Sequence, residues 1–195
     1  MPPSAPLPDE RSMPEPQLGE VLYSSSDIAA RVQALGAEVS EDLAGTTPVV
    51  VTVLTGATIF SADLTRAMDL PHEMDFLAVS AFDGHAPGDQ VQVTKDLQHP
   101  IADRDVVLVE DVIDTGLTLR FILSWLESRR PRSIRVCTLL DRPHRRLAEV
   151  DIHYRGFTPP DGFYVGYGFD WRQRYRNLPD LVELDLSPAP VAPGQ

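Results

Sequence analysis

Cysteine is almost absent from this sequence, because Cys137 is the only one among 195 residues. A single thiol cannot form an internal disulfide, and it excludes a zinc site built from several cysteines. Basic side chains are also few: 17 lysines and arginines stand against 29 aspartates and glutamates, which gives a formal net charge of -12. A surface this negative repels phosphate backbones at long range, so we expect no nucleic-acid partner.

Long hydrophobic runs are missing as well. No stretch approaches about 18 consecutive apolar residues, and the acidic, proline-rich N-terminus lacks the basic and apolar regions of a signal peptide. We therefore expect a cytoplasmic protein with no membrane partner. No internal repeat of fixed period is visible, which disfavours solenoids and propellers.

Proline is concentrated at the two ends of the chain. Residues 1–19 and 187–195 contain repeated prolines and few large apolar groups, so they cannot bury enough surface to offset the entropy of ordering. We predict two disordered tails there and a single domain over residues 20–186. Its length and its 43% hydrophobic content allow a substantial buried core.

Strand-like and helix-like segments alternate between these ends. The apolar spacing predicts helices over 26–43, with Asp27 or Ser26 as N-cap, over 59–68 and over 118–128. Apolar or alternating runs predict strands over 49–54, 74–80, 91–94, 106–109 and 134–140, and 82–90 is rich in turn formers. This alternation predicts an α/β fold, a mainly parallel central sheet flanked by helices. The aromatic segments DIHYRGF and GFYVGYGFDW are expected to form a small cap.

Acidic side chains gather where the strand 106–109 ends. Glu110 and Asp111 follow it directly, and Asp114 comes three positions later. Ligands bind at the carboxyl ends of parallel strands, and three acids at one rim are costly unless a metal or a polyhydroxyl ligand receives them. The segment DTGLT, with Gly116 permitting close backbone approach, opens a helix and suits a phosphate monoester. The sequence therefore predicts a site for a ribose 5-phosphate.

These residues resemble a known family. VVLVEDVIDTGLT is similar to the thirteen-residue phosphoribosyl pyrophosphate (PRPP) signature of type I phosphoribosyltransferases. LTGATIFSADLTRAM, TLLDRPHRR and FYVGYGFDWRQRYRNLPDL resemble the first phosphate loop, the base-recognition loop and the C-terminal purine and metal segment of the hypoxanthine-guanine phosphoribosyltransferases. The resemblance spans roughly residues 24–184. It implies the type I phosphoribosyltransferase fold, with a core at about 45–145 and a hood, mainly at about 150–185, built from the C-terminal and N-terminal segments.

The resemblance also implies roles for residues that contact PRPP. Glu110 and Asp111 take the ribose hydroxyls, partly through Mg²⁺. The 5-phosphate is held by the backbone and hydroxyls of Asp114, Thr115, Gly116, Leu117 and Thr118. In the family the turn matching Thr55-Gly56 contains a non-proline cis peptide whose amide meets pyrophosphate, and Arg176 is a second pyrophosphate ligand.

Another group of residues is implied to bind the purine. Asp114 is the catalytic residue, as general base or hydrogen-bond partner at purine N7. Phe163 stacks on the base, Tyr164 offers backbone groups, and Asp170 binds the second Mg²⁺ next to it. Arg142 stands where the family usually has a lysine that donates to O6, and such a donor favours 6-oxopurines over adenine.

The implied activity is purine salvage: transfer of phosphoribose from PRPP to N9 of hypoxanthine or guanine by a homodimer or homotetramer. Three positions depart from the family pattern, namely Thr55 for lysine, Ala81-Phe82 for Ser-Tyr, and Arg142 for lysine. They leave open a preference for xanthine. They also leave open a regulator with this fold that has lost activity and binds RNA or a nucleotide.

Overall fold

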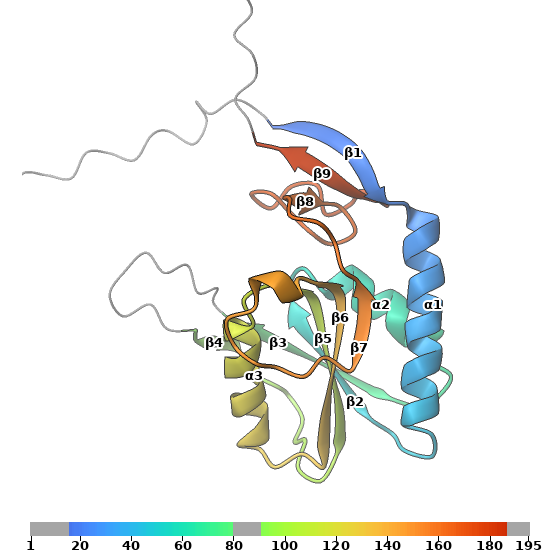
Figure 1. Cartoon of the computed structure of the whole chain (residues 1–195). Helices are drawn as coiled ribbons and strands as arrows, with labels where there is room; N and C mark the ends of the chain where they lie inside the picture. Colours follow the sequence, from blue (N-terminus) through green and yellow to red (C-terminus); the bar gives the residue numbers. More distant parts are fainter. Residues whose placement is uncertain (1–15, 80–90, 187–195) are drawn as a thin grey trace, which may run out of the picture.

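The computed structural model describes residues 16–79 and 91–186, and Figure 1 shows two sheets in this part of the chain. The six-stranded central sheet has the order β4-β3-β2-β5-β6-β7, formed by Val93–Lys95, Glu73–Val79, Val49–Leu54, Asp105–Ile113, Ser133–Asp141 and Tyr154–Phe157. Its neighbouring strands are parallel, except that β4 is antiparallel to β3. The smaller sheet, β1-β9-β8, is antiparallel and is formed by Gln17–Tyr23, Leu181–Asp185 and Tyr164–Val165.

Helices cover both faces of the central sheet, as the alternation of segments predicts. Helices α1 (Ser25–Asp42) and α2 (Thr58–Ala67) share one buried cluster with Val50, Val107 and Val109. Helix α3 (Leu117–Glu127) packs with Val51 and Leu108 in the other cluster. Successive strand residues point to opposite faces, so an uninterrupted apolar run fills both layers. In Figure 1, α1 and α3 accordingly lie on opposite sides of the sheet.

Helix α1 begins earlier than the sequence predicts. Its N-cap is Ser24, whose hydroxyl accepts a hydrogen bond from the Asp27 backbone N–H at 3.2 Å. The Asp27 carboxylate in turn accepts from the Ser24 backbone N–H at 3.1 Å. This reciprocal capping box satisfies two amides at the start of the helix. Asp27 therefore completes the cap from within the helix, and the prediction that Asp27 or Ser26 is the N-cap is wrong.

The strand order places a topological switch point between β2 and β5. From β2 the chain passes through α2 to β3 on one side, and the later strand β5 pairs with β2 on the other side. At such a point the loops that follow the two central strands separate, and a crevice opens beyond their carboxyl ends. The turn after β2 and the loop after β5 contain the segments that the sequence analysis singled out.

The small sheet forms a hood beyond one end of the central sheet (Figure 1). It joins N-terminal and C-terminal segments, because β1 pairs with β9. Two predicted boundaries are wrong. Residues 17–19 belong to β1 and not to a tail, since they pair with β9. The segment DIHYRGF belongs to the core and not to the cap, since its β7 pairs with β6.

Several predictions fall outside the described residues. They concern residues 1–15 and 187–195, assigned to tails, and the segment 80–90, which contains Ala81-Phe82 and the expected loop 82–90. Within the described ranges, none of the helices is long and apolar enough to cross a membrane.

Candidate active site

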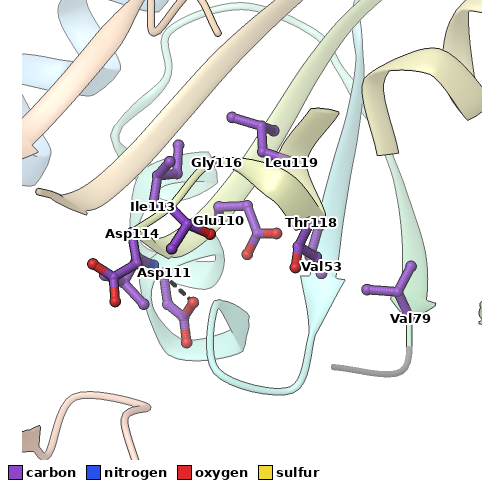
Figure 2. Close-up of a pocket in the computed structure, with 11 residues that line it drawn as sticks. Val53, Val79, Glu110, Asp111, Ile113, Asp114, Gly116, Thr118 and Leu119 are labelled. Carbon is purple, nitrogen blue, oxygen red and sulfur yellow. Dashed lines mark hydrogen bonds between the residues drawn. The ribbon is translucent and has the colours of Figure 1, made fainter. Parts of the chain in front are cut away.

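Three acids lie at the carboxyl end of β5. The strand continues to Ile113, so Glu110 and Asp111 are part of it and do not follow it. Glu110 is buried, with 8% of its surface exposed. Figure 2 shows its carboxylate with those of Asp111 and Asp114 near the start of α3. Burial, together with the neighbouring charge of Asp111, raises the pKa of Glu110 well above its usual range, and burial also raises the pKa of Asp111. Carboxyl groups whose burial costs this much free energy are expected where a ligand binds them.

The turn after β2 lies against one of these acids. A Cβ atom built on Gly56 would lie 1.7 Å from Asp111 Oδ2, so no side chain fits there while the carboxylate keeps its position. The peptide bond Leu54-Thr55 in the same turn is cis, as the resemblance implies for this turn. Thr55 and Gly56 thus border the same crevice as the acids of β5, although more than 50 residues separate them in the sequence.

The loop after Asp114 presents backbone amides. Gly116 is the N-cap of α3 with a φ of 80°, a conformation that glycine adopts at little cost, and the Leu117 backbone N–H donates to Thr115 Oγ1 at 3.4 Å. The Thr115 carbonyl accepts hydrogen bonds from the backbone N–H groups of Leu147 and Ala148, which hold the loop in place. A cavity of about 310 Å³ is lined by Val53, Val79, residues 110–116, Thr118 and Leu119. Amides and a helix N-terminus facing a cavity of this kind suit an anion.

A second cavity of about 180 Å³ adjoins the first. It is lined by Asp111, Val112, Asp114, Arg142, Gly162, Phe163, Tyr164, Phe169 and Asp170. Arg142 at the end of β6 donates a hydrogen bond from Nη2 to the Gly162 carbonyl at 2.9 Å. Its guanidinium lies 5.5 Å from the centroid of the Tyr164 ring. Phe163 is 41% exposed, which leaves its ring surface available for stacking. An aromatic wall with a few polar groups is typical of a site for a planar heterocycle.

Asp170 and Arg176 are paired beside Asp111. Arg176 Nη2 lies 2.7 Å from Asp170 Oδ1, and the Gln173 backbone N–H donates to Asp170 Oδ2 at 2.7 Å. Arg176 also donates to the Gly168 carbonyl at 2.6 Å. The positive charge of Arg176 lowers the pKa of Asp111, whereas the negative charge of Asp170 raises it. The loop from 166 to 176 therefore brings one charge of each sign close to the acids of β5.

The donor chemistry of the crevice fits Mg²⁺ held together with a substrate. Within residues 16–79 and 91–186, no three side chains of His, Cys, Asp or Glu are grouped closely enough to form a metal cage. Mg²⁺ does not need one, since it is usually held by one or two carboxylates, water and substrate phosphates. Glu110, Asp111 and Asp170 supply such carboxylates around the two cavities.

Sequence reasoning missed a group of charges behind and beside the loop. Arg145 Nη1 lies 3.0 Å from Asp114 Oδ2. The fully buried Asp141 pairs with Arg146 and with Arg155, whose Nε is 2.6 Å from Asp141 Oδ2. The only signal in the sequence is the basic run DRPHRR, and a run of arginines alone does not indicate which acids it contacts.

The fold and the crevice define the class to which the chain belongs. The family described as the phosphoribosyl transferase domain matches residues 20–172. A hypoxanthine-guanine phosphoribosyltransferase of Mycobacterium avium is 45% identical over 172 residues, which are 85% of this chain and 85% of that protein. A hypoxanthine phosphoribosyltransferase of Salmonella typhimurium is 42% identical over 86% of this chain and 96% of its own.

A solved structure gives the same result. The crystal structure of a hypoxanthine phosphoribosyltransferase from Staphylococcus aureus has a TM-score of 0.82 at 40% identity, over 86% of this chain and 92% of that one. The chain belongs to the hypoxanthine-guanine phosphoribosyltransferase family of type I phosphoribosyltransferases.

Proposed function

We propose that this chain is a purine-salvage enzyme that transfers the 5-phosphoribosyl group of PRPP to N9 of hypoxanthine or guanine. In this reaction the bond from C1 to pyrophosphate breaks as the bond from C1 to N9 forms, which gives IMP or GMP and pyrophosphate. The observation that supports it most strongly is the position of Asp114, which lines both the anion cavity and the aromatic cavity. A sugar phosphate in the first cavity and a base in the second would meet beside this residue.

The first cavity supports the binding of PRPP. Glu110 and Asp111 would bind the ribose hydroxyls, and the amides and hydroxyls of residues 114–118 would hold the 5-phosphate. The turn of Thr55 and Gly56 would meet the pyrophosphate, together with Arg176. Since Thr55 has no charge, the backbone of this turn, and not the side chain, would carry its contribution.

The second cavity supports the binding of a 6-oxopurine. Phe163 would stack on the ring, and a hydrogen-bond donor of Arg142 would face O6, where the amino group of adenine would be unpaired. Asp114 would bind the N7 side of the base, and Tyr164 would offer backbone groups to its other edge. Asp170 would lie next to the purine and the metal.

Mg²⁺, when bound, would neutralise the pyrophosphate as it leaves. Glu110, Asp111 and Asp170 are the residues that would hold it. With a net charge of -12, the protein needs local positive charge to bind PRPP, and Arg176 and the amides of the loop supply part of it.

A steady-state product assay with PRPP, Mg²⁺ and each of hypoxanthine, guanine, xanthine and adenine tests the proposal. We expect nucleotide formation with the first two bases and the highest kcat/KM for one of them. A higher kcat/KM for xanthine than for either of them would show that the enzyme prefers xanthine. Absence of any base consumption, with specific RNA binding in a filter-binding titration, would favour the regulator.

The resemblance also supports a homodimer or homotetramer in the cytoplasm and a single domain, which begins with β1 at Gln17 and extends to residue 186. Light scattering of the purified chain measures its mass directly: two or four times 21.6 kDa is expected, and a monomer would contradict this.

A further inference from the structure

We propose that Arg145 is a positioning residue for Asp114 in the transfer reaction, an inference that rests on the proposed function. Arg145 ends the short 3-10 turn Pro143–Arg145 that follows β6. Its Nη1 lies 3.0 Å from Asp114 Oδ2. None of the roles implied for the base-recognition loop includes this residue, so the ion pair needs an explanation of its own.

The two oxygens of Asp114 have different surroundings. Oδ2 faces two guanidinium groups, that of Arg145 at 3.0 Å and that of Arg142 at 4.0 Å. Oδ1 is buried and has no hydrogen-bond partner among the described residues. A buried acceptor without a donor costs free energy and indicates that a partner is missing. Because Asp114 lines the aromatic cavity, a purine N–H is a donor of the right kind for Oδ1.

Arg142 alone is not expected to fix Asp114. Its Nη2 is committed to the Gly162 carbonyl, its guanidinium lies over Tyr164, and its distance of 4.0 Å from Oδ2 is long for a hydrogen bond. Arg145 is closer, and its backbone N–H donates to the Arg142 carbonyl at 3.1 Å, which ties the turn to the end of β6. Arg145 therefore restrains Oδ2 and leaves Oδ1 to the base, while Arg142 remains available for O6.

The test compares Arg145→Gln and Arg145→Lys with the wild type in the full chain. For Arg145→Gln we expect kcat/KM for hypoxanthine to fall about fivefold to tenfold, since a half-exposed ion pair contributes modestly. The KM for PRPP should change by less than about twofold, because the hydrogen bonds from the Leu147 and Ala148 backbone N–H groups to the Thr115 carbonyl still hold the phosphate loop. Arg145→Lys keeps a charge in reach of Oδ2 and should recover most of the loss.

A double mutant separates positioning from a general structural effect. If Arg145 acts through Asp114, adding Arg145→Gln to Asp114→Asn should reduce kcat/KM by less than about twofold further. Arg104→Gln is a matched control, because Arg104 forms a surface ion pair with Glu73 at 2.9 Å, at the start of β3 and away from the site. It should leave both kinetic constants unchanged.

The outcomes separate this inference from the function on which it rests. An active wild type with unchanged kinetics in Arg145→Gln would overturn the role of Arg145 alone. So would losses that multiply in the double mutant, or a Lys variant no better than the Gln variant at equal Tm. A wild type inactive with every purine would overturn the proposed function and the inference together.

Discussion

Glu110 is an ionisable side chain buried where its negative charge destabilises the unliganded protein. Burial and the charge of Asp111 raise its pKa, because both disfavour the ionised form. The folded state therefore retains a proton on Glu110 at pH values where the unfolded chain has released it. The free energy of unfolding should fall as the pH rises from the ordinary value of 4.5 through the raised value. The stabilising contribution of protonated Glu110 is fully present below its ordinary pKa of 4.5.

Glu110→Gln should therefore stabilise the unliganded protein at neutral pH. We expect a gain of about 1 kcal/mol, or roughly 2–4 °C in Tm, which disappears near pH 4. PRPP affinity should fall in the same variant. Thermal unfolding at both pH values measures the effect, with Glu20→Gln, an exposed acid of β1, as the control. A less stable Glu110→Gln at neutral pH would mean that the carboxylate is already stabilised by a partner.

Asp114→Asn should lower turnover much more than PRPP affinity. The amide keeps the size of the side chain but loses the proton acceptor, and loss of a general base commonly costs about 10²-fold or more. Steady-state kinetics with hypoxanthine give kcat and the KM for PRPP separately. Equal losses in the two would mean that Asp114 only positions the substrate.

At the scale of elements, two loops that meet at the switch point form the phosphate side of the site, and segments after β6 and around β8 form its aromatic side. The strands and helices that carry these loops were predictable, because their apolar runs fill both layers of an α/β fold. Strand β2 occupies Val49–Leu54 as predicted. The hood was less accessible to prediction: β1 and β9 pair across more than 150 residues, β1 leaves large apolar residues such as Val21 exposed, and the buried residues of β9 are interrupted by the exposed Glu183. Neither strand has the buried run that identifies a core strand.

The contacts between these elements could not be derived from the residues alone. The resemblance implied the roles of Asp114 and Arg142, and the structure adds that Arg145, the last residue of the 3-10 turn, has its Nη1 3.0 Å from Asp114 Oδ2. Likewise, Gly56 could be predicted as a turn residue, but its closeness to the Asp111 carboxylate could not. Such proximity depends on the register of β2 and β5, which spacing along one segment does not encode.

Gly56→Ala should therefore impair the site more than the fold. The new methyl group would displace the Asp111 carboxylate or the turn, since the two would otherwise lie 1.7 Å apart. We expect kcat/KM for PRPP to fall about tenfold or more. Gly45→Ala is the contrasting control: its φ of +78° is strained for alanine, and no atom lies within 4 Å. It should lower Tm and leave the kinetics unchanged. Normal kinetics in Gly56→Ala would show that the contact with Asp111 is unimportant.

At the scale of the whole molecule, the negative net charge opposes the binding of PRPP. A chain of net charge -12 would bind a polyanion, and the acids of β5 add to the repulsion. Arg176 and the amides of the loop offset part of it, and Mg²⁺ shared with the pyrophosphate would offset the rest.

Removal of divalent cations should therefore abolish turnover. With excess EDTA we expect the rate of nucleotide formation to fall about 100-fold or more, and added Mg²⁺ should restore it. A coupled assay that follows the release of pyrophosphate measures this rate. Full activity in EDTA would mean that the side chains neutralise PRPP without a metal.

The central claim is that the acids of β5 and the loop 114–118 hold one phosphorylated sugar. The most direct measurement is a crystal structure of the chain soaked with PRPP and Mg²⁺. We predict the ribose hydroxyls on Glu110 and Asp111 and the 5-phosphate on the amides that open α3. A crevice without sugar, with PRPP bound elsewhere on the molecule, would contradict the account.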